Sequence, residues 1–258
     1  MGKPVALIDA DVWAYSCGFA AQSTLTGVFE EGEKFVDVEP VENALALAKR
    51  AIETTIRDMR AAGYPDYRLF LSGKENFRFA VAQVAPYKGN RVQEKPVHYK
   101  AIREYMIKRY GATVTNGNEA DDAVTEASYE LGHDRRACVI VSQDKDLRTV
   151  PGALYNPKKE VFEYITPAQA LVNECRQILV GDVADNIPGC YKVGPVGAKR
   201  LITPKMPRSE CVRVMEEAFE DSQNRPGCPY TDRPAVSVMI EMGNLVHLRR
   251  FEGDVWNP

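Results

Sequence analysis

The sequence lacks the features of several large protein classes. Its six cysteines form no C-x-x-C pair and only three histidines accompany them, so we expect neither a zinc site nor a disulfide framework. No apolar run approaches membrane-spanning length. The N-terminal apolar run reaches Asp9 too soon for a signal peptide. We therefore expect a cytoplasmic protein with reduced cysteines and no membrane contact.

An excess of positive charge is also missing, because the formal net charge is −3. Nucleic-acid-binding chains are usually basic, but the distribution of charge matters more than its sum. Residues 74–109 contain nine Lys or Arg against three Glu, a local excess of +6. A run of this kind is either a solvated surface or a binding segment for phosphate.

The apolar pattern alternates between strand-like and helix-like segments. Short apolar runs predict buried strands at 4–9, 67–71 and 137–142, with shorter strands at 112–115 and 160–165 and a hairpin at 26–38 whose turn is near Glu31-Gly32. Helical spacing appears at 40–62, 98–109, 117–131, 167–180, 207–222 and 234–250, with a further helix opening near Ala198. The alternation favours an α/β fold with a parallel sheet.

Three carboxylates crowd the first turn of the helix expected at 117–131, namely Glu119, Asp121 and Asp122. Acidic residues at a helix N-terminus oppose the positive end of its dipole, so capping is one explanation. Three carboxylates exceed what a cap needs and repel one another. From this helix alone, capping and metal binding both remain open.

Further acids follow other predicted strands and helices. Asp9 and Asp11 end the first strand, Asp144 and Asp146 follow the strand at 137–142, and Asp182 and Asp185 lie just after the helix at 167–180. Ligands of parallel α/β sheets bind beyond the carboxyl ends of the strands. Oxygen ligands without His or Cys suit Mg²⁺ or Mn²⁺, and a pair of such ions can cleave a phosphodiester bond.

Together these motifs resemble the 5′-nuclease family of flap endonucleases and 5′-to-3′ exonucleases. The resemblance spans most of residues 5–203 and rests on these motifs, in order: Leu-Ile-Asp; Phe-Arg at 77–78 with Pro-Tyr-Lys-Gly-Asn-Arg at 86–91; Glu-Ala-Asp-Asp at 119–122; Asp-Lys-Asp at 144–146; and Gly-Asp-x-x-Asp-Asn-Ile-Pro-Gly at 181–189. The C-terminal Leu-Arg-Arg-Phe-Glu-Gly-Asp-Val-Trp-Asn-Pro is similar to exonucleases of T7-type bacteriophages.

The resemblance implies a fold with two domains. Residues 1–166 would form a PIN-like, Rossmann-like nuclease core that includes a helical arch in the basic region 74–110. Residues 167–258 would form a helical DNA-binding region with a helix-hairpin-helix at 181–203. The turn of that hairpin would hold K⁺, although its usual Gly-x-Gly appears here as Gly194-Pro195-Val196-Gly197.

The resemblance also implies residue roles for a two-metal mechanism. The first Mg²⁺ or Mn²⁺ would be held by Asp9, Glu119, Asp121, Asp122 and Asp144, and the second by Asp146, Asp182 and Asp185. Asp9 and Asp144 would be catalytic together with Lys88 and Arg91, which would contact the scissile phosphate. Further DNA contacts would come from Arg78, from Tyr87 stacking on the terminal base, and from Lys199 and Arg200.

The implied activity is release of nucleotides from the 5′ end of duplex DNA, with cleavage of flaps and of RNA in RNA–DNA hybrids. A phage-encoded monomer in the host cytoplasm, working with replication proteins, fits this interpretation. One departure is that no basic residue lies between Asp11 and Lys34, where relatives often carry a phosphate contact. Another side chain would have to supply it.

Two other functions compete with this interpretation. Leu-Ile-Asp9-Ala-Asp11-Val resembles the nucleophile motif of haloacid-dehalogenase-type phosphatases, in which Asp9 would attack phosphorus, Asp11 would be the acid/base, and Ser72 would serve as the second motif. That interpretation leaves residues 119–122 and 181–202 without a role. A DNA-binding protein without catalysis is the other alternative, and intact acids in every group argue against it.

Overall fold

The computed structural model describes residues 2–25, 35–92, 94–133 and 136–258. Each of its two compact units is assembled from several stretches of chain. The sheet unit comprises Met1–Lys74, Gln93–Gln143 and Tyr155–Phe162, and the helical unit comprises Glu75–Val92, Asp144–Leu154 and Glu163–Pro258. A single boundary at residue 166 differs from this division, because two stretches that precede it in the chain pack on helices that follow it.

The sheet confirms the predicted α/β class with mostly parallel strands. Its order is β5-β4-β1-β6-β7-β8, formed by β1 (Val5–Asp9), β4 (Asp66–Leu71), β5 (Thr113–Val114), β6 (Cys138–Val141), β7 (Gly152–Asn156) and β8 (Val161–Ile165). β1 is central and pairs in parallel with both β4 and β6, and β4 pairs in parallel with β5. The central strand is almost wholly buried, as its continuous apolar run predicts.

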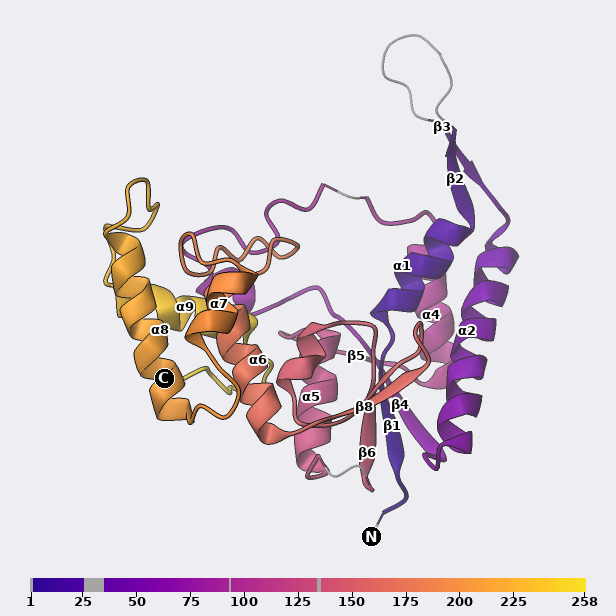
Figure 1. The fold of residues 1–258 in the computed structure, drawn as a ribbon. Helices are drawn as coiled ribbons and strands as arrows, with labels where there is room; N and C mark the ends of the chain where they lie inside the picture. The colour runs from indigo at the N-terminus through magenta and orange to yellow at the C-terminus, as the bar shows by residue number, and fades with distance from the viewer. Residues whose placement is uncertain (1, 26–34, 93, 134–135) are drawn as a thin grey trace. The chain divides into compact units, whose positions relative to one another are not determined.

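Helices cover both faces of the parallel strands. On one face, α5 (Ala120–Glu130) contacts β1, β4 and β6, and on the other face α1 (Asp11–Ala20), α2 (Val41–Ala61) and α4 (Tyr99–Tyr110) pack against one another (Figure 1). The sequence did not predict α1, whose apolar residues are not confined to one stripe. One buried position of α1 carries no side chain at all, because a Cβ on Gly18 would lie 2.6 Å from Pro96 Cγ.

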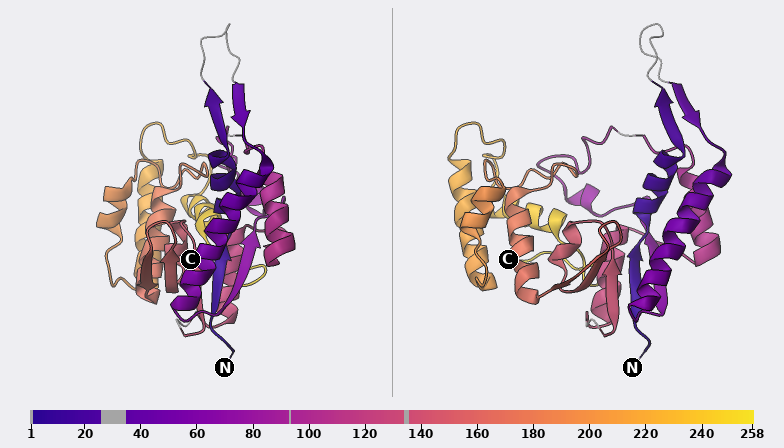
Figure 2. Two further views of the ribbon diagram at one scale, coloured as in Figure 1. Left: turned by 90° about the vertical axis from the view of Figure 1, so that its right-hand side faces the viewer. Right: turned by 45° about the vertical axis from the view of Figure 1, so that its right-hand side comes forward.

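An antiparallel pair follows α1. It consists of β2 (Gln22–Leu25) and β3 (Phe35–Val38), in register from Gln22 opposite Val38. In Figure 2 the two strands lead away from the end of α1. The first strand begins earlier than the predicted hairpin at 26–38, and the turn expected near Glu31-Gly32 lies outside the described residues.

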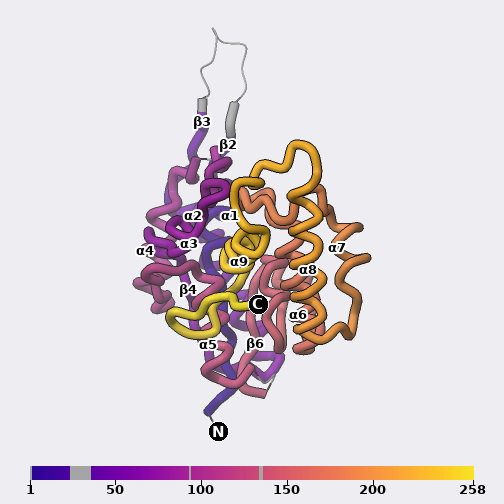
Figure 3. Tube along the Cα trace, turned by 90° about the vertical axis from the view of Figure 1, so that its left-hand side faces the viewer, coloured from indigo at the N-terminus to yellow at the C-terminus, as the bar shows by residue number. Residues whose placement is uncertain are grey.

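The helical unit has its own core, built mainly by α6 (Pro167–Val180), α8 (Arg208–Gln223) and α9 (Ala235–Val246). The tube in Figure 3 shows α6 and α8 side by side with α7 (Pro195–Leu201) next to them. Ile178, Phe219 and Met239 are fully buried at the centre of this core. Two short elements complete the unit, α3 (Arg78–Val81) and the 3₁₀ helix η1 (Asp146–Thr149).

The predicted arch region 74–110 is helical mainly at its end, in α4. α3 is one turn long, and the described residues between it and α4 are irregular, as the many prolines and charges of this stretch lead one to expect. In the described part of the chain, no helix is both long enough and apolar enough to cross a bilayer.

Candidate functional site

In the sheet unit, the first predicted acid lies at the carboxyl end of the central strand. Asp9 is the last residue of β1, and the Oγ of Ser142, just after β6, donates to Asp9 Oδ2 at 3.1 Å. Because β1 and β6 are parallel, their carboxyl ends meet at one edge of the sheet. The sequence analysis missed Ser142, although its position directly after a predicted strand was a usable signal.

Asp11 takes part in a separate polar cluster at the start of α1. Its Oδ2 accepts the Ser72 backbone N–H at 2.9 Å and its Oδ1 accepts Arg103 Nη1 at 2.7 Å. Arg103 also donates to the Ser72 carbonyl at 2.6 Å. Arg103, on α4, is therefore a basic side chain next to the first motif, where the sequence has none nearby.

These contacts argue against the phosphatase alternative. An acid/base carboxyl needs an open path to the substrate, but Asp11 is tied to a backbone N–H and a guanidinium. The Ser72 hydroxyl is also engaged, since it accepts the N–H of Ala120 at the start of α5 at 2.9 Å. Asp11 and Ser72 therefore join β4, α1, α4 and α5.

All three acids at the start of α5 take part in capping the helix. Asp122 is fully buried, and its Oδ2 accepts the Glu119 backbone N–H at 3.1 Å. Glu119 and Asp122 together form a capping box, and Asp121 Oδ1 accepts the Asp122 N–H at 2.7 Å. Glu119 and Asp121 are only partly buried. Capping is thus observed at this helix, and the metal-ligand roles of the three acids stay predictions.

In the helical unit, four predicted ligands lie close enough to influence one another. Asp144 Oδ1 accepts the Asp146 N–H at 2.8 Å, and Asp182 Oδ1 accepts the N–H groups of Ala184 and Asp185 at 2.7 and 3.3 Å. Burial, followed by the charges of Asp144 and Asp182, raises the pKa of Asp146 to about 7. A carboxylate cluster of this kind favours the binding of a cation.

Two glycines fix the turn that carries Asp182 and Asp185. Gly181 has φ 72° and ψ −165°, a region that essentially only glycine adopts. A Cβ there would overlap the Ile187 carbonyl oxygen and lie 2.6 Å from Gly189 N. Gly189 also has positive φ, 67°. The spacing of the motif at 181–189 therefore follows from the close approach of its two ends.

Asp185 is surrounded by three of the predicted DNA-contacting residues. Arg91 Nη2 donates to Asp185 Oδ1 at 2.5 Å, Lys88 Nζ lies 3.7 Å from Oδ2, and the Tyr87 hydroxyl donates to Oδ2 at 2.8 Å. Tyr87 is only 4% exposed and its ring packs against Phe79. Tyr87 therefore holds Asp185 in this structure, and its stacking on a terminal base stays a prediction that its burial does not favour, whereas Arg91 is exposed.

Arg78 also has a different role from the one implied. Its side chain is 2% exposed, and its guanidinium donates to the carbonyls of Leu245 and His247, both at 2.9 Å. A phosphate contact requires an accessible guanidinium, so the burial of Arg78 does not favour the predicted DNA contact, which stays a prediction. The residue instead satisfies carbonyls at the C-terminal end of α9, where cations oppose the helix dipole.

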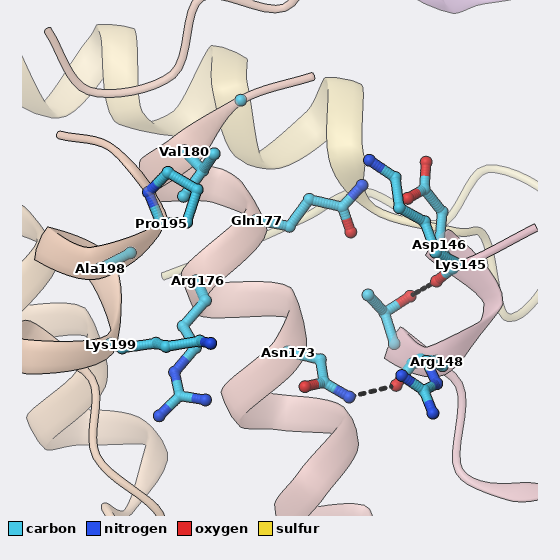
Figure 4. A pocket seen from close by; sticks show the side chains of 12 residues that line it. Lys145, Asp146, Arg148, Asn173, Arg176, Gln177, Val180, Pro195, Ala198 and Lys199 are labelled. Carbon is cyan, nitrogen blue, oxygen red and sulfur yellow. Dashed lines mark hydrogen bonds between the residues drawn. The ribbon is translucent and has the colours of Figure 1, made fainter. Parts of the chain in front are cut away.

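A pocket of about 230 Å³ lies between η1, α6 and α7 (Figure 4). Its lining residues include one acid, Asp146, and four cationic residues, Lys145, Arg148, Arg176 and Lys199. Arg176 donates to the Ile202 carbonyl at 2.9 and 2.7 Å, and Lys145 pairs with Asp182 at 3.0 Å. Lys199 and Arg200 are exposed on α7, which leaves them accessible for the predicted phosphate contacts. No motif pointed to Arg148 or Arg176.

The donor chemistry of the acidic residues fits a hard divalent cation, since every predicted ligand is a carboxylate. Among the described residues, no three Asp, Glu, His or Cys side chains are already spaced as a complete metal site. In the helical unit two of the predicted ligands have cationic partners, because Lys145 pairs with Asp182, and Lys88 and Arg91 pair with Asp185. Divalent ions would replace these internal partners.

Carboxylates that lie beside exposed cations are typical of sites that bind a phosphate together with a hard divalent cation. Comparison with known proteins shows which of them this chain resembles. No protein-family model matches the chain. The chain is 26% identical over 214 residues to a 5′-3′ exonuclease of Buchnera aphidicola subsp. Schizaphis graminum, covering 74% of this chain and 67% of that protein.

Solved structures show the same fold. A mutant of T5 5′-exonuclease matches with a TM-score of 0.60 at 14% identity, covering 96% of this chain and 89% of its own. T5 5′-exonuclease with bound divalent zinc ions also gives 0.60, at 14% identity and coverages of 95% and 89%. A T5 flap endonuclease complex with DNA and metal ions gives 0.55, at 13% identity and coverages of 95% and 99%. The resemblance to 5′-nucleases is thus confirmed.

Proposed function

We propose that the protein is a divalent-metal-dependent 5′-nuclease that hydrolyses phosphodiester bonds at the 5′ end of duplex DNA. The observation that carries the proposal is the group of four carboxylates in the helical unit, with Lys88 and Arg91 bonded to one of its members. The likeness to a 5′-3′ exonuclease and to T5 flap endonuclease supports this reaction over a phosphatase.

The carboxylates serve as ligands for Mg²⁺ or Mn²⁺ in two sets. The sheet unit supplies Asp9, Glu119, Asp121 and Asp122, and the helical unit supplies Asp144, Asp146, Asp182 and Asp185. When bound, the ions supply an activated water and neutralise the leaving oxygen. Ser142 orients the Asp9 carboxylate through its hydroxyl, and Asp122 orients Glu119 by capping α5.

Lys88 and Arg91 act on the scissile phosphate. Both cations pair with Asp185, and the scissile phosphate would compete with that carboxylate for them. Arg91 offers the planar donors that match two phosphate oxygens, whereas Lys88 offers a single point charge. Binding of the phosphate thus requires both side chains to exchange Asp185 for phosphate oxygens.

The duplex backbone binds through the exposed cations of α7, Lys199 and Arg200, together with the pocket between η1, α6 and α7. K⁺ in the turn before α7, cleavage of RNA in hybrids, and action alongside replication proteins in the cytoplasm, as a monomer, complete the proposal. Because backbone contacts release counterions, affinity falls with rising salt.

The decisive experiment uses duplex DNA labelled at either its 5′ or its 3′ end, with Mg²⁺ or EDTA. Short 5′-labelled products that need Mg²⁺, and that disappear in Asp144→Asn, are expected. Asp232→Asn, which removes an exposed acid elsewhere in the helical unit, is the matched control and should cleave normally. Release from the 3′ end, or cleavage in EDTA, would refute the proposal.

A further inference from the structure

Two short segments of the helical unit are joined to each other by several hydrogen bonds. The basic segment, residues 86–91, carries Lys88 and Arg91. The acidic turn, residues 182–187, carries Asp182 and Asp185 and is closed by an antiparallel bridge between Asp182 and Ile187. The two segments lie almost a hundred residues apart in the chain, so their register depends on direct contacts.

Side-chain amides join the two segments from both sides. Asn90 Nδ2, on the basic segment, donates to the Val183 carbonyl at 2.6 Å, and Asn186 Nδ2, on the acidic turn, donates to the Pro86 carbonyl at 2.9 Å. Between them, the Lys88 N–H donates to the Asp185 carbonyl at 2.8 Å. We call the bonds of Asn90 and Asn186 the amide clasp.

The backbone conformation shows that the surroundings hold these segments in place. Lys88 has φ 55° and Asn186 has φ 58°, both in the left-handed region. Asparagine adopts this region more readily than most residues, whereas lysine does so rarely. Such conformations persist where neighbouring contacts over-determine them. Lys88 is thus held in a backbone conformation that a free loop would leave.

Neither asparagine contributes to the hydrophobic core, since Asn90 is exposed and Asn186 is only half-buried. Both side-chain amides instead reach across to a carbonyl on the other segment. Loss of either amide should therefore loosen the basic segment without unfolding the helices. This separates the clasp from the nearby Tyr87, whose ring is part of the core.

We propose that Asn90 and Asn186 are positioning residues, which keep the basic segment in register with the acidic turn so that Lys88 and Arg91 stay within reach of Asp185. The proposal rests on the proposed function for the role of Lys88 and Arg91 in cleavage. The physical claim, that two side-chain amides fix the segment, is independent of any activity.

Hydrogen exchange tests the physical claim through the amide of Lys88, which the Asp185 carbonyl protects. The variants are Asn90→Ala, Asn186→Gly and the two combined, with glycine chosen because it accepts the positive φ of residue 186. Each lost bond should speed exchange at Lys88 about fivefold, and the double variant about 25-fold. Asn224→Ala, which removes an exposed amide bonded to the Glu220 carbonyl on α8, is the matched control and should leave Lys88 unchanged.

Two results would overturn the clasp. One is exchange at Lys88 within about twofold of wild type in the double variant. The other is equally faster exchange throughout α8 and α9, which would show general destabilisation. Asn90→Asp keeps the side-chain shape but lacks the donor, so exchange at Lys88 should match that of Asn90→Ala.

Cleavage kinetics then test the consequence for the reaction. The double variant should lose about tenfold in kcat while KM for duplex DNA stays within about twofold, because Lys199 and Arg200 are untouched. A raised KM with unchanged kcat would contradict the positioning role. If the wild-type protein cleaves no 5′ end, the proposed function fails, and the exchange experiment still decides whether the clasp exists.

Discussion

Replacing Gly181 with alanine should destabilise the protein far more than the same change at another glycine with positive φ. At Gly181 the new Cβ would overlap the Ile187 carbonyl oxygen and crowd Gly189 N, both of them backbone atoms that cannot rotate away. Gly253 shares a positive φ, 77°, but a Cβ there meets nothing within 4 Å. The pair compares a positive-φ glycine whose Cβ would overlap backbone atoms with one whose Cβ would meet open space.

We expect Gly253→Ala to lower the free energy of unfolding by about 1–2 kcal/mol, the cost of a left-handed alanine. Gly181→Ala should cost roughly 2 kcal/mol more, because the turn backbone must also move. Urea unfolding followed by circular dichroism measures both values. Gly181→Ala should also lose cleavage activity, since Asp182 and Asp185 lie on the displaced turn. Equal destabilisation by the two variants would refute this account of the motif.

Three further predictions concern other parts of the molecule. Arg103→Met should destabilise by about 2–3 kcal/mol in urea unfolding, because it leaves the half-buried Asp11 without its cation; an unchanged stability would contradict the pairing. Burial opposes protonation of His247, but hydrogen bonds with Glu174 and Asp254 outweigh it and raise the pKa of His247 above its usual 6.5. The charged imidazole therefore stabilises the fold below pH 6.5, and this contribution should disappear as the pH rises through the raised pKa, a dependence that is absent in His247→Gln. Finally, Lys199→Met should reduce the slope of log affinity for duplex DNA against log salt by about 0.9; an unchanged slope would remove Lys199 from the interface.

Much of the fold could be predicted because burial leaves a direct trace in the sequence. β1 and β6 are continuous apolar runs and β4 ends in the buried run Leu69, Phe70 and Leu71, and α6 was predicted at 167–180, the range it occupies. Its Thr166 cap and Pro167 are the local signals of a helix start. β7 was missed, since its residues Gly152–Asn156 have no alternating pattern.

The candidate site was less predictable because side-chain roles depend on contacts distant in sequence. A buried arginine and an exposed one have the same letter, so the sequence could not show that Arg78 is buried with its guanidinium on carbonyls at the C-terminal end of α9. Arg103 was not considered because 92 residues separate it from Asp11. Asp122 shows a third limit, since a cap and a ligand need the same residue type at the same position.

The most direct test of the account is the dependence of single-turnover cleavage rate on Mn²⁺ concentration, measured for wild type and for Asp182→Asn. Two sets of carboxylates holding two ions predict a rate that rises more steeply than the first power of Mn²⁺ concentration in the wild-type protein. The variant should need more Mn²⁺ and show a shallower dependence. A first-power dependence that is identical in both proteins would contradict a two-ion site that includes Asp182.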